Sequence, residues 1–289
     1  MSEQIDIEKE LDEGRKPGNQ TFFKKNSKNI LIITRGHPFE RDSFFDMIDS
    51  LGLNWSHIEH PAAQSFLKKE NLKNFDAILF YDMPGLNFDE FENESKFFIE
   101  PPKEYKKDLI KQLKEGIGCV FLHHSIAGWP SWDEYSNIIG GKFLYKSGKI
   151  KGRECSDSGY RHFVNYKVSA VGKHQITKGL DDFELEDELY LSHVFEKDIN
   201  PILISDYSFT KNNFYSATNA LKGKMNSNEN WEHSDGSNVI GWTKSYKNSA
   251  ITYLQFGDSA KSYKNNNVRM LIRRSIDWVI KETKELKKV

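Results

Sequence analysis

Two adjacent histidines at the end of an apolar run are the residues best suited to chemistry in this sequence. His123 and His124 follow the run 119–122 (Cys-Val-Phe-Leu), which is typical of a buried β-strand. An imidazole changes its charge near neutral pH, so we predict that both histidines are catalytic acid/base or ligand-orienting groups. The alternative is structural, with one ring buried and hydrogen-bonded and the other at the surface.

Ser125 follows the two histidines and could be a nucleophile, because a neighbouring imidazole can act as its base. The sharp turns that present such a serine need the pattern Gly-x-Ser-x-Gly, whereas this turn reads Leu-His-His-Ser-Ile. We therefore expect Ser125 to bind substrate through its hydroxyl group rather than to attack it.

A carboxylate and a phenol two residues apart form the second candidate group. Alternate residues of an extended strand share a face, so Glu188 and Tyr190 are predicted on one face and Asp187 on the other. We predict that Glu188 is a third catalytic residue and that Tyr190 binds substrate. An exposed strand end in a chain with 42 acidic residues fits the spacing equally well.

Other polar residues stand at the ends of predicted strands, where open α/β sheets bind their ligands. His37 follows the first strand, Asp82 the third and Asp258 the last, and all three are predicted to bind substrate. Trp132 and Tyr135 are predicted to form an aromatic wall of the kind that stacks on sugar rings. Packing of these two side chains within a helix face is the competing interpretation.

The sequence assigns no metal ligand and predicts no cofactor. It contains no His-x-x-x-His or Cys-x-x-Cys spacing, and it lacks the glycine-rich loops that bind dinucleotides or nucleoside triphosphates. A divalent metal bound by histidines stays an alternative with little support from spacing. Its candidate ligands are His37, His123, His124, His162 and His174.

The order of strands and helices predicts a doubly wound, mostly parallel α/β sheet. Buried strands are expected at 29–34, 55–59, 76–81 and 119–123, with helices at 41–51, 65–72 and 104–115 between them. A helix is expected to begin at Ser131, with Glu134 completing a capping box. Additional strands are expected in the C-terminal half at 163–168, 185–191, 201–205, 239–242 and 249–256, before a helix at 268–280.

Composition limits the class of protein and its partners. The 289 residues carry 41 basic and 42 acidic side chains, so we expect neither a nucleic-acid nor a membrane partner. The polar start and the absence of a long apolar run predict a cytoplasmic protein, unless a signal peptide has been removed. Two cysteines in unlike settings predict no disulfide. We expect a polar N-terminal arm at 1–28, one α/β domain at 29–289 and an inserted loop at about 209–235; a homo-oligomer is compatible with the sequence.

Short motifs run in order along the chain: Gly36-His37-Pro38 with Arg41-Asp42, 80–83, 118–126, Trp132-x-x-Tyr135, 139–141, 174–180, 183–190, 240–242, 256–258 and Arg274-x-x-x-Trp278. In this order they resemble the trehalose-utilisation (ThuA-like) family over roughly residues 29–282. The resemblance implies a class I glutamine amidotransferase-like, flavodoxin-like fold, a shallow pocket at the sheet end, and a link to carbohydrate metabolism; Arg41 is added to the predicted substrate-binding residues. Amidotransferase activity is not implied, since the turn lacks a cysteine.

Two positions depart from the pattern of this family. His174 precedes Gln175 where the family usually has proline, and Gly257 precedes Asp258 where the family usually has histidine. The second change replaces an imidazole by a carboxylate in the expected pocket. It weakens any expectation of histidine-based proton transfer or metal binding at that position.

Together these observations predict an enzyme that acts on a small sugar or keto-sugar derivative by acid/base chemistry, as a hydrolase, isomerase or lyase. A non-catalytic sugar- or metabolite-binding protein with the same pocket is the rival hypothesis, and a scaffold with a vestigial pocket is the third. Pocket geometry separates them. If His123 or His124 is within hydrogen-bonding distance of a carboxylate and open to solvent, the enzyme is favoured, whereas burial of both rings in apolar packing contradicts it.

Overall fold

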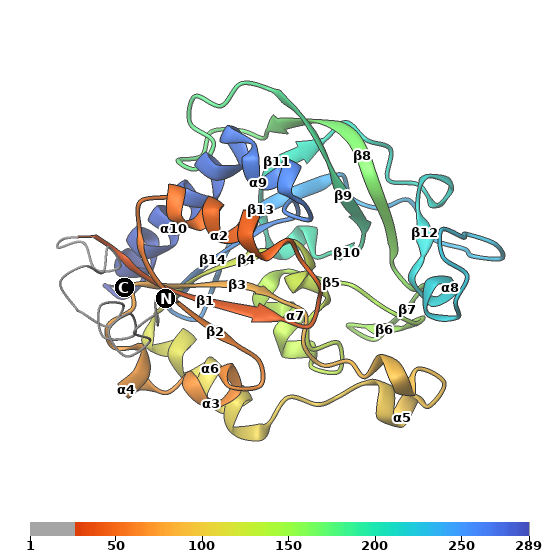
Figure 1. Ribbon diagram of the computed structural model, residues 1–289, viewed down its shortest axis with the longest axis horizontal. Coiled ribbons are helices and arrows are strands. Elements are labelled where there is room, and N and C mark those ends of the chain that lie inside the picture. Colours follow the sequence, from red (N-terminus) through yellow and green to blue (C-terminus); the bar gives the residue numbers. More distant parts are fainter. Residues whose placement is uncertain (1–26, 289) are drawn as a thin grey trace, which may run out of the picture.

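Five parallel strands form one half of the central sheet in the computed structural model, which describes residues 27–288 (Figure 1). They lie in the order β2-β1-β3-β4-β14, the flavodoxin-like order, and the sequence prediction of a doubly wound sheet is confirmed. Their bounds are β1 (Asn29–Arg35), β2 (Asn54–Glu59), β3 (Ala77–Asp82), β4 (Gly118–Leu122) and β14 (Ser249–Leu254).

Helices cover both faces of these strands, which explains why the strands read as continuous apolar runs. Alternate residues of β1 enter different cores: Ile30 and Ile32 belong to one, and Leu31 and Ile33 to the other. Figure 1 shows one layer of helices above the strands and a second layer below them. The first layer is α2 (Arg41–Ser50), α9 (Ala260–Lys264) and α10 (Asn266–Leu286); the second includes α3 (Ala63–Phe66), α4 (Lys69–Leu72), α6 (Lys103–Glu115) and α7 (Asp133–Ile139).

An antiparallel extension continues the sheet beyond β14, as predicted for the C-terminal half. It runs through β13, β11 and β8 to the short β12, and β9 forms a long antiparallel pair with β8. The bounds are β8 (Gly159–Ala170), β9 (Phe183–Leu191), β11 (Asn200–Ser205), β12 (Tyr215–Ser216) and β13 (Val239–Tyr246). Two small sheets pair β5 (Gly141–Lys142) with β10 (His193–Val194) and β6 (Gly148–Ile150) with β7 (Arg153–Cys155).

Short helices lie in the connections that surround the sheet end. The 3₁₀ helix η3 (His123–Ala127) replaces the last residue of the strand expected at 119–123. The stretch 209–235, expected as a loop, contains short elements, and its Trp231 is buried in a core. The remaining short elements are η2 (Phe88–Glu90), α5 (Glu94–Phe97), η4 (Glu196–Asp198), η5 (Lys211–Asn213) and α8 (Ala217–Leu221).

Two local predictions were wrong. The helix expected at 65–72 is divided into α3 and α4, because Lys68 adopts an extended conformation between them. The capping box expected at Ser131 and Glu134 is absent: α7 begins at Asp133, the Ser131 hydroxyl donates to the carbonyl of Ile99, and the Glu134 carboxylate accepts the Tyr246 hydroxyl. Tertiary hydrogen bonds thus take both side chains away from the helix end.

Both cysteines are free, as expected. Across residues 27–288, the structure contains no helix with the length and apolar character needed to cross a membrane. All but the last two residues of the arm predicted at 1–28 lie outside the described residues.

We predict that Gly118→Ala destabilises the fold by about 1–3 kcal/mol, the usual cost of overpacking a core. A β-carbon at this position would lie 2.7 Å from the main-chain oxygen of Val279, where β4 rests on α10. Gly148→Ala in β6 is the matched control, because its nearest neighbour would be 3.9 Å away, and its effect should stay within about 0.5 kcal/mol. Urea unfolding measures both, and equal stabilities would contradict the close packing of β4 on α10.

Candidate functional site

A glycine brings the loops after β1 and β3 into contact at the carboxyl end of the sheet. Gly36 has a φ of +100°, and a β-carbon there would lie 2.1 Å from the main-chain oxygen of Met83. Only glycine fits this approach. The turn places the ring of His37 against that of His124, with 4.7 Å between ring centroids. The predicted strand ends therefore do converge.

His123 is fully buried, and its ring is fixed from both sides. Its Nδ1 lies 2.6 Å from the carbonyl oxygen of Gln255, which can only accept, so Nδ1 carries a proton. Three oxygens surround its other nitrogen, Nε2: the Tyr190 hydroxyl at 2.8 Å, a Glu188 carboxylate oxygen at 3.1 Å and an Asp258 carboxylate oxygen at 3.5 Å. The histidine thus gathers one phenol and two carboxylates around a single nitrogen.

Glu188 lies between two imidazoles. One carboxylate oxygen faces His123, and the other lies 3.1 Å from Nδ1 of His162. Glu188 is only 3% exposed, whereas the side chain of His162 is 36% exposed. Glu188 and Tyr190 share one face of β9, as strand alternation predicted, and both contact His123. His123 therefore contacts carboxylates but is closed to solvent, and His124 is also buried, so neither meets the condition set for the enzyme. The carboxylate-bound histidine that is open to solvent is His162.

Asp187, on the opposite face of β9, holds the turn that carries Asp258. Its carboxylate accepts hydrogen bonds from the main-chain nitrogens of Gly257 at 2.6 Å and Asp258 at 3.1 Å, and from the Ser262 hydroxyl at 2.8 Å. Burial raises the pKa of Asp187 to about 6 in spite of these bonds. The position of Asp258 beside His123 depends on this anchor.

Charge and burial shift the pKa values of the site histidines in opposite directions. Burial alone would lower the pKa of His123, but the carboxylates of Asp258 and Glu188 outweigh it and hold the pKa well above its usual value. Burial and the nearby histidines lower the pKa of His37 and lower that of His124 further. The pKa of Asp258 is lowered, because its bond to His123 outweighs the effect of burial. The site therefore separates charged from neutral imidazoles.

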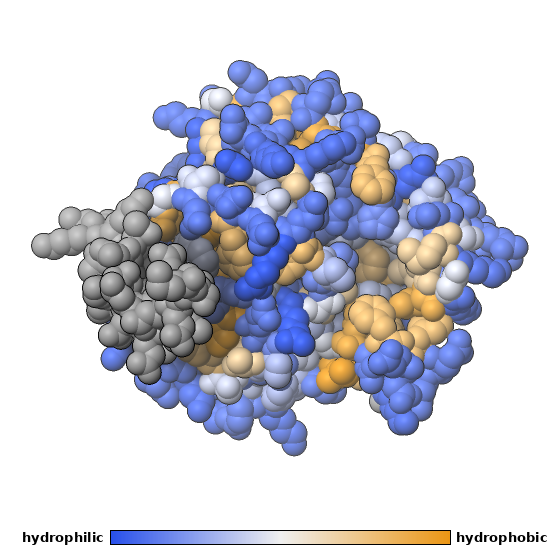
Figure 2. All heavy atoms as spheres, in the orientation of Figure 1, coloured by the Kyte–Doolittle hydropathy of each residue, from blue (hydrophilic) through white to orange (hydrophobic). Residues whose placement is uncertain are grey.

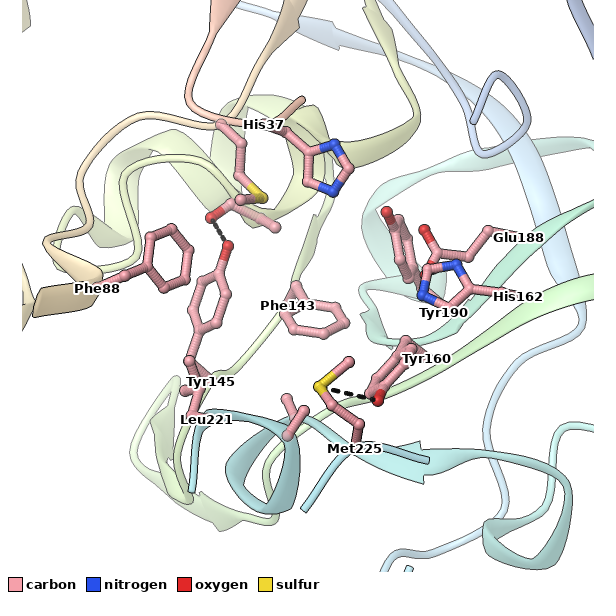
Figure 3. Close-up of a pocket in the computed structure, with 14 residues that line it drawn as sticks. His37, Phe88, Phe143, Tyr145, Tyr160, His162, Glu188, Tyr190, Leu221 and Met225 are labelled. Carbon is pink, nitrogen blue, oxygen red and sulfur yellow. Dashed lines mark hydrogen bonds and ion pairs between the residues drawn. The ribbon is translucent and has the colours of Figure 1, made fainter. Parts of the chain in front are cut away.

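A pocket of about 330 Å³ opens beside this group (Figure 3). Figure 3 shows Glu188, His162 and Tyr190 together on one side, with Phe88 and Tyr145 across the cavity and Leu221 and Met225 along another edge. Figure 2 shows hydrophobic side chains gathered around a hollow between α8 and the segment that carries α5. The other lining residues are His37, Met83, Ala127, Phe143, Tyr160, Ala217 and Ala220. The cavity thus has one ionisable side and extensive aromatic and aliphatic sides.

The helix α8 forms part of this apolar lining and is tied down by one carboxylate. Asp157 accepts hydrogen bonds from the Ser216 hydroxyl at 2.6 Å and from the main-chain nitrogen of Thr218 at 2.9 Å. The Ser216 hydroxyl in turn accepts the nitrogen of Asn219 and caps the helix. Leu221 and Met225, at and after the end of the helix, reach the pocket.

Several predicted site residues lie in the protein interior instead of on the pocket wall. His124 is buried between the rings of His37 and Tyr81. The Ser125 hydroxyl donates to the carbonyl of Phe80 at 2.9 Å, and the buried Asp82 binds His60 Nε2 at 2.7 Å. The first bond holds the turn after β4 against β3, and the second ties the end of β3 to the residue that follows β2.

Three further predicted residues lie away from the pocket. Arg41 forms an exposed ion pair with Glu59 at 2.8 Å. Trp132 and Tyr135 pack on each other in the core beneath α7, which agrees with the packing interpretation. Among the metal-ligand candidates, His174 packs against Trp278.

Sequence reasoning missed the place of His162 beside Glu188. A β-bulge between Arg161 and Val164 interrupts the β8–β9 register, and Phe163 within it has a φ of +55°. The bulge changes which side chains of β8 face Glu188. No turn residue or spacing in the sequence signals it, whereas the alternation of Tyr160 and His162 could have suggested a shared face.

Comparisons with known proteins identify a family and a shared fold. A model of the family described as trehalose utilisation (ThuA) matches residues 29–279. A ThuA-like protein from Parabacteroides merdae is 14% identical, with a TM-score of 0.60 over 88% of this chain and 90% of that one. A second, from Bacteroides uniformis, is 15% identical, with a TM-score of 0.55 over 90% and 95% of the two chains. A glutamine amidotransferase from Thermotoga maritima is 10% identical, with a TM-score of 0.47 over 89% and 99%.

The structural neighbours establish the fold and leave the substrate open. Their identity to this chain is low, and no curated protein sequence matches it. The family match spans nearly all of the α/β domain, including the strand ends that carry His37, His123, Glu188 and Asp258. The chain therefore belongs to the trehalose utilisation (ThuA) family.

Proposed function

We propose that this protein is an enzyme of carbohydrate metabolism that acts on a small sugar or keto-sugar derivative. The observation that carries the proposal is the Glu188–His162 pair, which faces a pocket lined by aromatic rings. Aromatic faces suit the C–H surfaces of a sugar ring, and a carboxylate-bound histidine suits proton transfer. The family's link to trehalose utilisation supports a carbohydrate as the substrate.

In this proposal His162 exchanges a proton with the substrate, and Glu188 orients its ring. The contact from Glu188 to Nδ1 leaves Nε2 of His162 free to reach a substrate in the pocket. His123 is a positioning residue, because it holds the other oxygen of Glu188 and is itself fully buried. His124, Asp82 and Ser125 support the same turn from behind the pocket.

The arrangement favours removal of a proton beside a carbonyl group, the first step of an isomerase or lyase acting on a keto-sugar. Glycoside hydrolysis by the usual mechanism needs two carboxyl groups on opposite sides of the bond. Among the residues that the structure describes, Glu188 is the only carboxylate that lines this pocket. A single acid/base histidine next to one carboxylate fits proton abstraction better.

A non-catalytic binding protein is the second candidate, and one observation favours it. Most of the pocket lining is aromatic or aliphatic, and the polar groups of Glu188 and Tyr190 already bind other side chains. Such a pocket could hold a sugar derivative without transforming it. The apolar side formed by Leu221 and Met225 would in either case receive an apolar substituent of the ligand rather than bare sugar hydroxyls.

We predict that His162→Gln lowers turnover by about 10² to 10⁴-fold, the usual contribution of a general acid or base, with a smaller loss of binding. The measurement is proton NMR in D₂O on a panel of free sugars, keto-sugars and glycosides. It follows deuterium incorporation at the carbon beside the carbonyl and the conversion of each compound. His174→Gln is the control, because that partly buried histidine lies away from the pocket.

Binding without exchange or conversion, equal in wild type and His162→Gln, would favour the binding protein. If no member of the panel bound, the carbohydrate proposal itself would fail. Thermal-shift measurements on the same panel establish binding independently of turnover. The same samples therefore distinguish an enzyme, which binds and converts a sugar, from a binding protein, which only binds it.

We predict that Leu221→Ala weakens binding of phenyl glycosides by about three- to tenfold, while binding of the matching methyl glycosides changes little. The substitution removes apolar surface from the pocket lining and adds no charge, so the loss should follow the apolar area of the ligand. Leu180→Ala is the control, since this partly buried leucine lies outside the pocket. Calorimetric titration measures the affinities; equal losses for both ligands would contradict an apolar subsite.

A further inference from the structure

The group around His123 Nε2 has a donor set and a charge that suit a cation. Nδ1 is protonated toward Gln255, so a neutral ring presents its Nε2 lone pair to the carboxylates of Glu188 and Asp258. Lone pair and carboxylates repel one another unless a positive charge lies between them. A second proton on the ring supplies one charge, and a metal ion would supply two.

The balance of charge around this group is negative. Glu188 and Asp258 converge on one histidine, and Asp187 lies directly behind the turn of Asp258. In the part of the chain that the structure describes, no lysine or arginine forms an ion pair with any of these three carboxylates. A protonated His123 ring supplies one positive charge to carboxylates that carry more than one negative charge, and coordination of a metal is one of the ways proteins stabilise such a group.

We propose that His123, Glu188 and Asp258 form a binding site for a divalent cation. One ligand atom from each residue lies within 4.8 Å of the others, so small side-chain movements bring all three to metal–ligand distances of about 2.0–2.2 Å. The Gln255 carbonyl fixes the ring so that Nε2 is the ligand, the arrangement by which proteins orient metal-binding histidines. The mixed nitrogen and oxygen donors favour Zn²⁺ or Mn²⁺ over Mg²⁺.

The site opens toward the pocket through Glu188, which leaves room for ligands that the three residues do not supply. Glu188 and His162 both line the cavity, and Tyr190 lies beside Nε2 of His123. A cation held here would face the polar end of a bound compound and could polarise its carbonyl oxygen. The inference goes beyond the proposed function, since cation binding requires no sugar.

The test is calorimetric titration of the full chain, freed of metal with a chelator, with Zn²⁺, Mn²⁺ and Mg²⁺. We expect one Zn²⁺ or Mn²⁺ per chain, and Mg²⁺ should bind more weakly. Asp258→Asn and Glu188→Gln keep the side-chain shape but remove a charged ligand, so each should weaken binding at least about tenfold. Glu186→Gln is the matched control, because this carboxylate lies on the same strand and pairs with Lys261.

A second measurement identifies the nitrogen ligand in the wild-type protein. Pulsed electron paramagnetic resonance of the Mn²⁺-loaded chain should show coupling to an imidazole nitrogen, and this signal does not depend on whether a variant folds. Absence of the coupling, absence of binding, or affinities unchanged in both carboxamide variants would each overturn the proposal. All these measurements omit sugars, so failure of the carbohydrate proposal would leave their outcome unaffected.

Discussion

The buried carboxylate of Asp187 joins the two halves of the molecule. It belongs to β9 of the antiparallel extension, and its partners Gly257, Asp258 and Ser262 follow β14 of the parallel half. The position of Asp258 at the sheet end depends on this link, because it sets β9 against the loop whose Asp258 reaches His123. Glu188 and Tyr190, on the opposite face of β9, contact His123 directly.

The site also shows how one buried ring can organise several charges. The bond from Nδ1 of His123 to the Gln255 carbonyl fixes the position of one proton on the ring. The other ring nitrogen, Nε2, faces oxygens from β9 and from the loop after β14. Burial and the nearby His37 and His123 hold the pKa of the adjacent His124 well below the usual value. These adjacent histidines thus have pKa values shifted in opposite directions, because His123 contacts carboxylates whereas His124 packs against aromatic rings.

Most of the fold could be predicted from the sequence because the parallel strands are buried on both faces. The continuous apolar run Ile30–Ile33 predicts a buried strand without any information from the rest of the chain. The glycines after α6 mark the start of β4. The carboxyl ends of these strands then brought His37, His123 and Asp258 to one place without further information. Strand alternation was enough to assign Glu188 and Tyr190 to the same face.

The rest depended on tertiary contacts that leave no local signal. Ser125 and Asp82 look like site residues in sequence, but hydrogen bonds to Phe80 and His60 commit them to the interior. The place of His162 depends on an irregular pairing of β8 with β9. The two sides of the pocket come from separate parts of the chain: the ionisable side belongs to the central sheet, whereas α8 belongs to the segment between β11 and β13 and is held by Asp157 and by a two-residue strand. A change of that segment would alter the apolar side of the pocket and leave the residues of the sheet end in place.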